Sequence, residues 1–258
     1  MKHVYTTIPV QIILLILLTF LFTGSTTTGK VELTMADPSD LNDRFSECGE
    51  PLVDIDDNDY RTVKIGNQCW MSENLRVTRY RDGSDIQTGL TNSQWENSII
   101  GAYAIYQYDI HPLSEKIEWV GSREEMVKYF GKLYNWYAVD DNRGLCPEGW
   151  RVPSDRDWTE LIEYLGDSAG RKMKSVVRQY WLTPNLPGSN ESGFSGIPGG
   201  LRFSDGTYFL LGRQGSWWSS SEIDRHHAWN RFLFTNGNDV SSGSFNKRFG
   251  FSVRCLQE

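Results

Sequence analysis

The stretch GLCPEGWRVPSDRDWTELIEYLG, residues 144–166, contains the clearest helix start in the chain. Ser154 can cap the helix N-terminus, and Asp157, three residues later, can complete a shortened capping box. One apolar stripe follows at helical spacing: Trp158, Leu161, Ile162 and Leu165. Gly166 can adopt a positive φ and should end the helix. The pattern predicts a helix over 155–165 that packs on a core.

The segment Cys-Pro-Glu-Gly-Trp (146–150), which we call the collar, precedes this helix. It contains Cys146, one of four cysteines. An even number of cysteines in an exported chain is typical of disulfides, but four allow three pairings, and spacing cannot choose between them. The chain has no CxxC or CxxH spacing, so we expect no zinc site. We also expect no cofactor.

Residues 1–25 have the composition of a secretory signal peptide. The apolar run from Ile8 to Phe22 is short for a membrane-spanning helix. We therefore expect export to the periplasm, the cell surface or the medium. The alternative is an uncleaved anchor, which would be the only link to a membrane. Residues 26–47 are polar and without period, which predicts a linker ahead of a domain over 48–258.

Composition excludes one class of partner. The 258-residue chain has a net charge of −7 and no Lys/Arg block, whereas nucleic-acid binding needs a concentrated basic face. Its 10 Trp and 24 Gly residues indicate a globular, loop-rich domain.

A second short helix is expected over about 168–177. TNGND (235–239) predicts a hairpin, and RFGFSVRC (248–255) alternates as a strand that turns Cys255 inward.

An acidic turn near the start of the domain resembles a calcium loop in part. Asp54, Asp56 and Asn58 occupy the first, third and fifth positions of an EF-hand-like loop. However, Asp59 stands where the loop needs Gly, and Ile65 stands where a bidentate Glu should close the site. We therefore favour a solvated hairpin turn over a metal site.

Five stretches in order across the domain carry a family resemblance. They are CGEPLVDIDDNDYRTVKIGNQCWMSENLRVTRYRDGS (48–84), GKLYNWYAVDDNRGLCPEGWRVPSDRDWTELIEYLG (131–166), NESGFSGIPGGLRF (190–203), GSWWSSSE (215–222) and RFGFSVRC (248–255). Together they resemble the Fibrobacter succinogenes major paralogous domain, a family without an assigned activity. The resemblance implies an α+β, loop-rich fold in which one or two helices pack on short antiparallel strands. Such a fold would be related to formylglycine-generating enzymes (sulfatase-modifying factors) and, more distantly, to C-type lectins.

The resemblance also implies the cysteine pairing, Cys146 with Cys255 and Cys48 with Cys69. The collar would then join the start of the helix to the last strand. Closing a loop of about 109 residues is worth about 4–5 kcal/mol by the chain-entropy relation.

The formylglycine-generating relatives suggest an oxidase, whose chemistry depends on cysteines that hold copper. The matching strand, HHAWNRFLF (226–234), contains no cysteine, and Cu(I) requires soft ligands. Adjacent His226 and His227 would face opposite sides of a strand, and no GxSxG elbow accompanies the serines of WWSSSE. We find no catalytic constellation and expect a non-enzymatic protein, with a divergent enzyme as the least favoured alternative.

We expect a binding or adhesion module whose partner is a polysaccharide or another surface protein. An envelope structural or assembly protein is the alternative. Exposed aromatic rings beside polar groups would suit a sugar face, and lectin-like folds place their sites in the loop-rich half. The candidate ligand-binding residues are Tyr208, Trp217, Trp218, Trp229 and Arg231. Of the adjacent Trp217 and Trp218, one should face inward and the other outward. Arg231 replaces the Asp that follows Trp-Asn in calcium-dependent lectins, so we expect no calcium-mediated sugar site.

Overall fold

The computed structural model describes residues 47–106, 120–177, 179–183 and 186–258, all within one compact unit, Asp43–Glu258. The predicted signal peptide and almost the whole predicted linker lie outside the described residues. Within the described ranges, no helix is both long and apolar enough to cross a membrane. The unit is α+β, with short helices and several small antiparallel sheets.

The elements are short and are separated by long loops. The helices are α1 (Asn92–Asn97), α2 (Arg123–Phe130), α3 (Trp136–Val139), α4 (Asp155–Leu165) and α5 (Ala169–Met173). The strands are β1 (Leu52–Val53), β2 (Asp59–Tyr60), β3 (Thr62–Ile65), β4 (Gln68–Met71), β5 (Tyr103–Ala104), β6 (Leu133–Tyr134), β7 (Trp150–Arg151), β8 (Gly199–Arg202), β9 (Tyr208–Leu211), β10 (Gln214–Glu222), β11 (His227–Phe234), β12 (Ser241–Asn246) and β13 (Leu256–Gln257).

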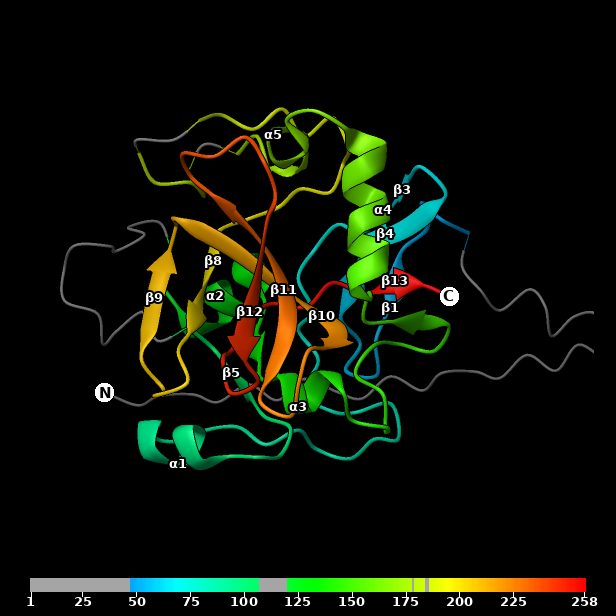
Figure 1. Cartoon of the computed structure of the whole chain (residues 1–258). Helices are drawn as coiled ribbons and strands as arrows, with labels where there is room; N and C mark the ends of the chain where they lie inside the picture. The colour runs from blue at the N-terminus through cyan, green and yellow to red at the C-terminus, as the bar shows by residue number, and fades with distance from the viewer. Residues whose placement is uncertain (1–46, 107–119, 178, 184–185) are drawn as a thin grey trace, which may run out of the picture. The chain divides into compact units, whose positions relative to one another are not determined.

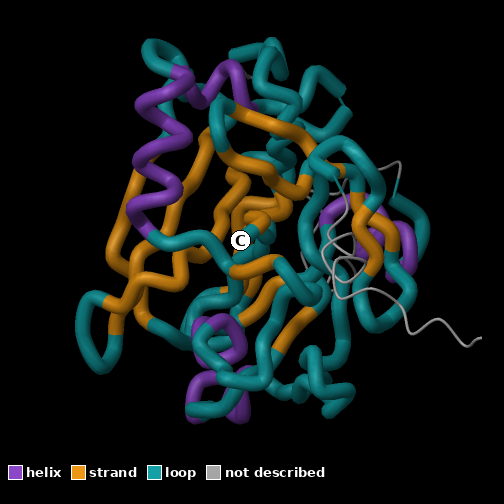
Figure 2. Tube along the Cα trace, turned by 90° about the vertical axis from the view of Figure 1, so that its right-hand side faces the viewer, coloured by secondary structure: helices purple, strands orange, loops and turns teal. Residues whose placement is uncertain are grey.

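Two sheets organise the unit. The β10-β11-β12 sheet contains the longest strands, and Figure 1 shows α4 standing alongside it. The second sheet has the order β3-β4-β13-β7, so the C-terminal strand lies between an early strand and the collar strand β7. Leu256 pairs with Trp70 on one side and with Arg151 on the other. Figure 2 shows the C-terminus in the middle of the view with strands around it.

Helix α4 has the predicted bounds, Asp155–Leu165. The side chain of Ser154 accepts from the Asp157 backbone, Asp157 completes the capping box, and Gly166 follows with φ 65°. Of the predicted apolar stripe, three members are buried: Trp158, Leu161 and Leu165. These local signals were sufficient because the helix is amphipathic and both of its ends are capped by its own neighbours.

The second predicted helix is shorter than expected, because α5 ends at Met173. The chain leaves the helix to pair with a distant segment: Gly196 N donates to Met173 O (2.7 Å), and Ser175 N donates to Gly196 O (2.9 Å). Met173, inside the helix, is buried, whereas Val177, beyond its end, is 40% exposed.

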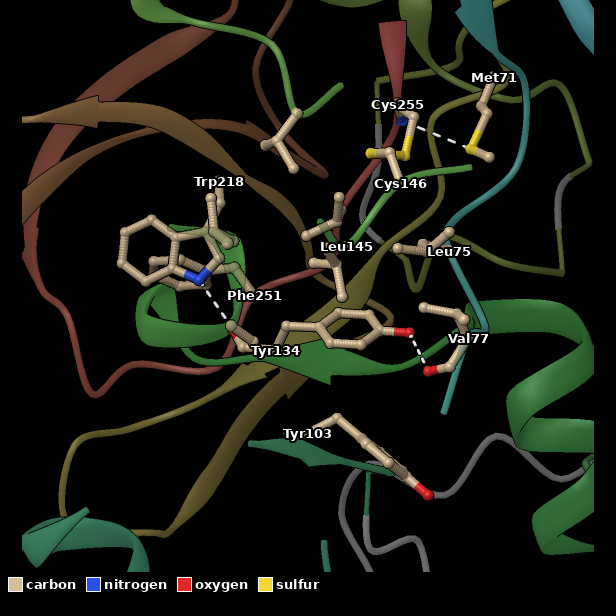
Figure 3. Close-up of a cluster of buried hydrophobic side chains, with 14 of the residues drawn as sticks. Met71, Leu75, Val77, Tyr103, Tyr134, Leu145, Cys146, Trp218, Phe251 and Cys255 are labelled. Carbon is tan, nitrogen blue, oxygen red and sulfur yellow. Dashed lines mark hydrogen bonds between the residues drawn. A yellow bond between two sulfur atoms is a disulfide. The ribbon is translucent and has the colours of Figure 1, made fainter. Parts of the chain in front are cut away.

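Both disulfides implied by the family resemblance are present and confirm the pairing. Cys146 bonds to Cys255, and Cys48 bonds to Cys69. Figure 3 shows the Cys146–Cys255 bond among buried side chains, next to Met71. The collar therefore joins the start of α4 to the C-terminal segment, as the family resemblance implied.

The C-terminal segment differs from the single strand expected over 248–255. It makes isolated bridges at Gly250, Phe251 and Ser252 before β13 begins at Leu256. The alternation holds, since Phe251, Val253 and Cys255 all lie in one core cluster. The residues between them, Ser252 and Arg254, are equally buried, so both sides of this segment are covered.

Candidate functional site

The two adjacent tryptophans of β10 do not form a surface. Trp217 and Trp218 point to opposite sides of the strand, as predicted, but they are 1% and 0% exposed. Trp217 belongs to the cluster that contains Trp158 and Phe194, whereas Trp218 packs on Phe251 and donates to the Tyr134 carbonyl (2.8 Å; Figure 3). The expectation that one of them faces solvent is wrong, because packed layers cover both sides of β10.

The three further candidate residues do not complete an exposed site. Arg231 is the cross-strand partner of Trp217 on β11. Tyr208 is buried, with its ring beside Tyr106 and the Arg202 guanidinium. Arg231 is buried and forms an ion pair with Asp155 (2.5 Å), which links β11 to the first residue of α4. Trp229 is the one candidate that is part-exposed. The structure therefore does not bring the predicted aromatic residues together at one exposed place.

The acidic turn forms the expected hairpin between β1 and β2. Asp54 is buried, and its carboxylate accepts from the backbone of Asp56 (2.8 Å) and Asn58 (3.0 Å) and from the Tyr60 hydroxyl (2.6 Å). The turn is therefore closed by protein donors rather than simply solvated. Among the described residues, no group of three His, Cys, Asp or Glu side chains could hold a metal ion.

A cavity of about 720 Å³ lies beside the end of this turn, between α2, the chain after β4, and a loop over 190–197. We call it the Arg254 cleft. Its lining includes the rings of Tyr129 and Tyr180, whose centroids are 6.4 Å apart. Amide and hydroxyl groups line it as well: Asn58, Ser72, Ser175, Asn190 and Ser195. The cleft thus combines aromatic rings with amide and hydroxyl side chains, several of which are also bonded within the protein.

Helix α2 supplies one wall because of its own amphipathicity. Ser122 caps it by accepting from Glu125 N (3.1 Å), and Met126 and Phe130 face the core. This orientation leaves Lys128 exposed and Tyr129 part-exposed at the cleft.

The opposite wall is a loop closed by Asn190. Its side chain accepts from Ser195 N (2.7 Å) and donates to the Ser195 hydroxyl (2.9 Å). Both residues have a positive φ, 50° and 55°, which is uncommon for residues other than glycine. The loop is therefore held in a specific conformation that needs support from neighbouring groups.

That support comes from Arg254, which lines the cleft from beneath this wall and is 0% exposed. Its guanidinium donates to the carbonyls of Phe194 and Ser195, the latter at 3.0 Å, and to Asn74 Oδ1 at 2.9 Å. The guanidinium carbon also lies 4.2 Å from the centroid of the Phe194 ring.

Asn74 holds the arginine in turn. Its Oδ1 accepts from Trp217 Nε1 (2.9 Å) as well as from Arg254, while its Nδ2 donates to Phe130 O (2.8 Å) and Ser252 Oγ (3.1 Å). The amide group has no unused hydrogen atom, so its orientation is determined. Trp217 therefore contributes to the cleft from behind, as a positioning residue.

Burial gives Arg254 unusual electrostatics. Desolvation lowers the pKa of its guanidinium to about 9, a value at which the group still carries its charge at neutral pH. No carboxylate of the described residues lies at ion-pair distance from it. Glu73 acts on it only at longer range, and Glu73 is itself paired with Arg61 (3.0 Å). A buried charge without a close counter-charge is rare in proteins.

Sequence reasoning missed this site. Arg254 occupies a polar position in the alternating stretch RFGFSVRC, a pattern that usually marks a solvent-facing side. No local signal shows that this side is buried, because Asn74, Phe194 and Arg254 meet only through tertiary packing. The one indication in the sequence is that Asn74, Phe194 and Arg254 all lie within the stretches that carry the family resemblance.

The family comparison confirms the resemblance. The model of the Fibrobacter succinogenes major domain matches residues 63–257, which is most of the chain, so the chain belongs to this family. No curated protein and no solved structure shows a significant match.

Proposed function

We propose that this member of the Fibrobacter succinogenes major domain family is an exported, non-enzymatic carbohydrate-binding module whose ligand occupies the Arg254 cleft. The observation that carries the proposal is the composition of the cleft, in which Tyr129 and Tyr180 stand among amide and hydroxyl side chains. Sugar rings stack on aromatic faces while their hydroxyls exchange hydrogen bonds with such groups. The volume, about 720 Å³, lies within the usual range of small-ligand sites.

Two features support the export and the lectin-like architecture that form part of this proposal. Disulfides persist mainly in oxidising compartments, and the chain has two of them. The C-terminal strand β13 pairs with β4, near the start of the domain, as expected of a lectin-like fold with its ends close together. Together with the predicted signal peptide, these features favour a periplasmic, cell-surface or extracellular module.

Retention on insoluble polysaccharides tests the function. The purified domain should be retained by at least one member of a panel of neutral and acidic polysaccharides and released by the matching soluble oligosaccharide. Tyr129→Ala should reduce retention, because it removes a ring from the cleft. Tyr164→Ala is the matched control, since Tyr164 is 66% exposed and lies on α4 outside the cleft.

The alternative roles predict different results. An envelope assembly protein would not be retained by any polysaccharide and would instead associate with a protein of the same envelope. Retention that is equally strong for the Tyr129 and Tyr164 variants would place the sugar site outside the cleft and overturn the proposal as stated.

A further inference from the structure

The Arg254 cleft is unusually rich in cations for this protein. Its ionisable lining comprises four cationic side chains (Arg61, Arg76, Lys128 and Arg254) and three anionic ones (Asp59, Glu73 and Glu124). The balance is therefore 4 − 3 = +1, whereas the whole chain carries −7. The lining of the cleft is therefore net positive, although the chain as a whole is net negative.

Three of the four cations form no close ion pair with the residues that the structure describes. The Arg61 side chain pairs with Glu73, but Arg76, Lys128 and Arg254 have no carboxylate at ion-pair distance within the described part of the chain. Asp59 and Glu124 also line the cavity, likewise without an ion pair in the described ranges, and offset part of this charge, which leaves one net positive charge. A bound anion would therefore be favoured beside the three cations.

Arg76 is preorganised to bind such an anion. Its guanidinium lies over the Tyr60 ring, 4.5 Å from the centroid, and its Nη2 donates to the Asp59 carbonyl (2.5 Å). These contacts fix the side chain while leaving Nε and Nη1 without an acceptor among the described residues. Each free N–H can donate one charge-assisted hydrogen bond to a carboxylate oxygen.

Arg254 contributes differently, because it is covered by the loop over 190–197 and cannot touch a ligand directly. Its charge lies in a poorly solvated environment, where electrostatic interactions are screened less than at the surface. It therefore adds attraction for an anion in the cleft while holding the wall in place.

We propose that the ligand of the Arg254 cleft is an acidic saccharide, whose sugar carboxylate is bound by Arg76 and Lys128 above the buried charge of Arg254. The inference rests on the proposed carbohydrate-binding function and specifies its ligand class. The tyrosine rings and amide groups would hold the sugar skeleton, whereas the cations would distinguish uronic acids from neutral sugars.

Two forms of one oligosaccharide test the inference by titration calorimetry on the domain with its disulfides intact. One is tetragalacturonate, and the other is its fully methyl-esterified form, which has the same skeleton without the charges. We expect the acid to bind at least about tenfold more tightly at low salt, the gain of one hydrogen bond to a charged group. The preference should shrink as salt is raised from about 0.05 to 0.5 M.

Variants identify the residues involved. Arg76→Gln should weaken binding of the acid by about tenfold, and Lys128→Gln, at a more exposed position, by about threefold, while neither changes binding of the ester. Arg225→Gln is the control, because Arg225 is exposed in the turn between β10 and β11, away from the cleft. Circular dichroism and urea unfolding would establish that each variant is folded. Arg254 is left unchanged, since its removal would disturb the core.

The outcomes separate the two proposals. Equal affinity for the acid and the ester, or preference for neutral polysaccharides, would overturn the acidic ligand and leave the carbohydrate-binding proposal standing. Failure to bind either oligomer or any polysaccharide of the panel would overturn both. If the Arg76 and Lys128 variants still prefer the acid to the ester, the cations of the cleft do not cause the preference. That result would overturn the proposed site.

Discussion

Removing the Cys146–Cys255 disulfide should destabilise the protein more than removing Cys48–Cys69. The two bonds join residues 109 and 21 positions apart in the sequence. In the chain-entropy relation, a cross-link stabilises by restricting the unfolded chain, and its effect grows with the logarithm of the loop length. For these separations the relation gives about 4.8 and about 3.3 kcal/mol at 25 °C.

Packing acts in the same direction. Cys146 and Cys255 are both almost fully buried, whereas Cys48 is only part-buried. Replacing the first pair by alanine therefore leaves a larger defect in the core and adds to the entropic difference. Because the two loops share no residues, their contributions should be nearly additive.

Urea unfolding followed by tryptophan fluorescence measures both effects, using the Cys146→Ala/Cys255→Ala and Cys48→Ala/Cys69→Ala double variants beside the native protein. We expect the first to lose about 1.5 kcal/mol more than the second. The unfolding slope must be compared as well, since an altered denatured state would change it. A larger loss for the Cys48–Cys69 pair would refute the reasoning from loop length.

Three further predictions concern other contacts. Ser154→Ala should lower the free energy of unfolding by about 1 kcal/mol, whereas Ser168→Ala, at the start of α5 where no side-chain cap bond exists, should change it little. Equal losses would contradict the capping argument. Burial lowers the pKa of Lys174 to about 8 from its usual 10.5, so the unfolded state binds more protons between these values and stability rises with pH there. In Lys174→Met, the free energy of unfolding measured with urea should rise less between pH 8 and about 10 than in the native protein. An equal rise in both proteins would contradict the assignment to Lys174. Trp217→Phe keeps an aromatic side chain but removes the indole N–H that bonds to Asn74 and part of a buried ring, and should cost at least about 1 kcal/mol in the same assay; no loss would mean that the bond contributes nothing net.

Local signals were enough to predict α4 but not α5. The caps and the apolar spacing of α4 lie within the helix and its immediate neighbours, so the sequence window contains everything that defines it. The end of α5 is set instead by pairing of Met173 and Ser175 with Gly196, which no local pattern reports. The disulfide pairing likewise came from the family resemblance, since cysteine spacing leaves three pairings open.

The candidate site shows the same limit more sharply. Alternation predicted that Trp217 and Trp218 face opposite sides of β10, and they do. The number of layers that cover a strand is a tertiary property, so alternation could not show that both sides are buried. For the same reason, alternation places Arg254 opposite Cys255 but does not show that this side is buried as well, and the arginine lies in the interior behind the cleft.

The C-terminal segment connects stability to the proposed ligand site through three consecutive residues. Leu256 pairs with strands on both sides, Cys255 is bonded to the collar of α4, and Arg254 supports the wall of the cleft. In an extended chain, adjacent side chains point in opposite directions, so fixing Cys255 on the collar side also directs Arg254 toward the cleft. The disulfide that closes the fold therefore also helps to hold in place the buried charge on which recognition of an acidic sugar would depend.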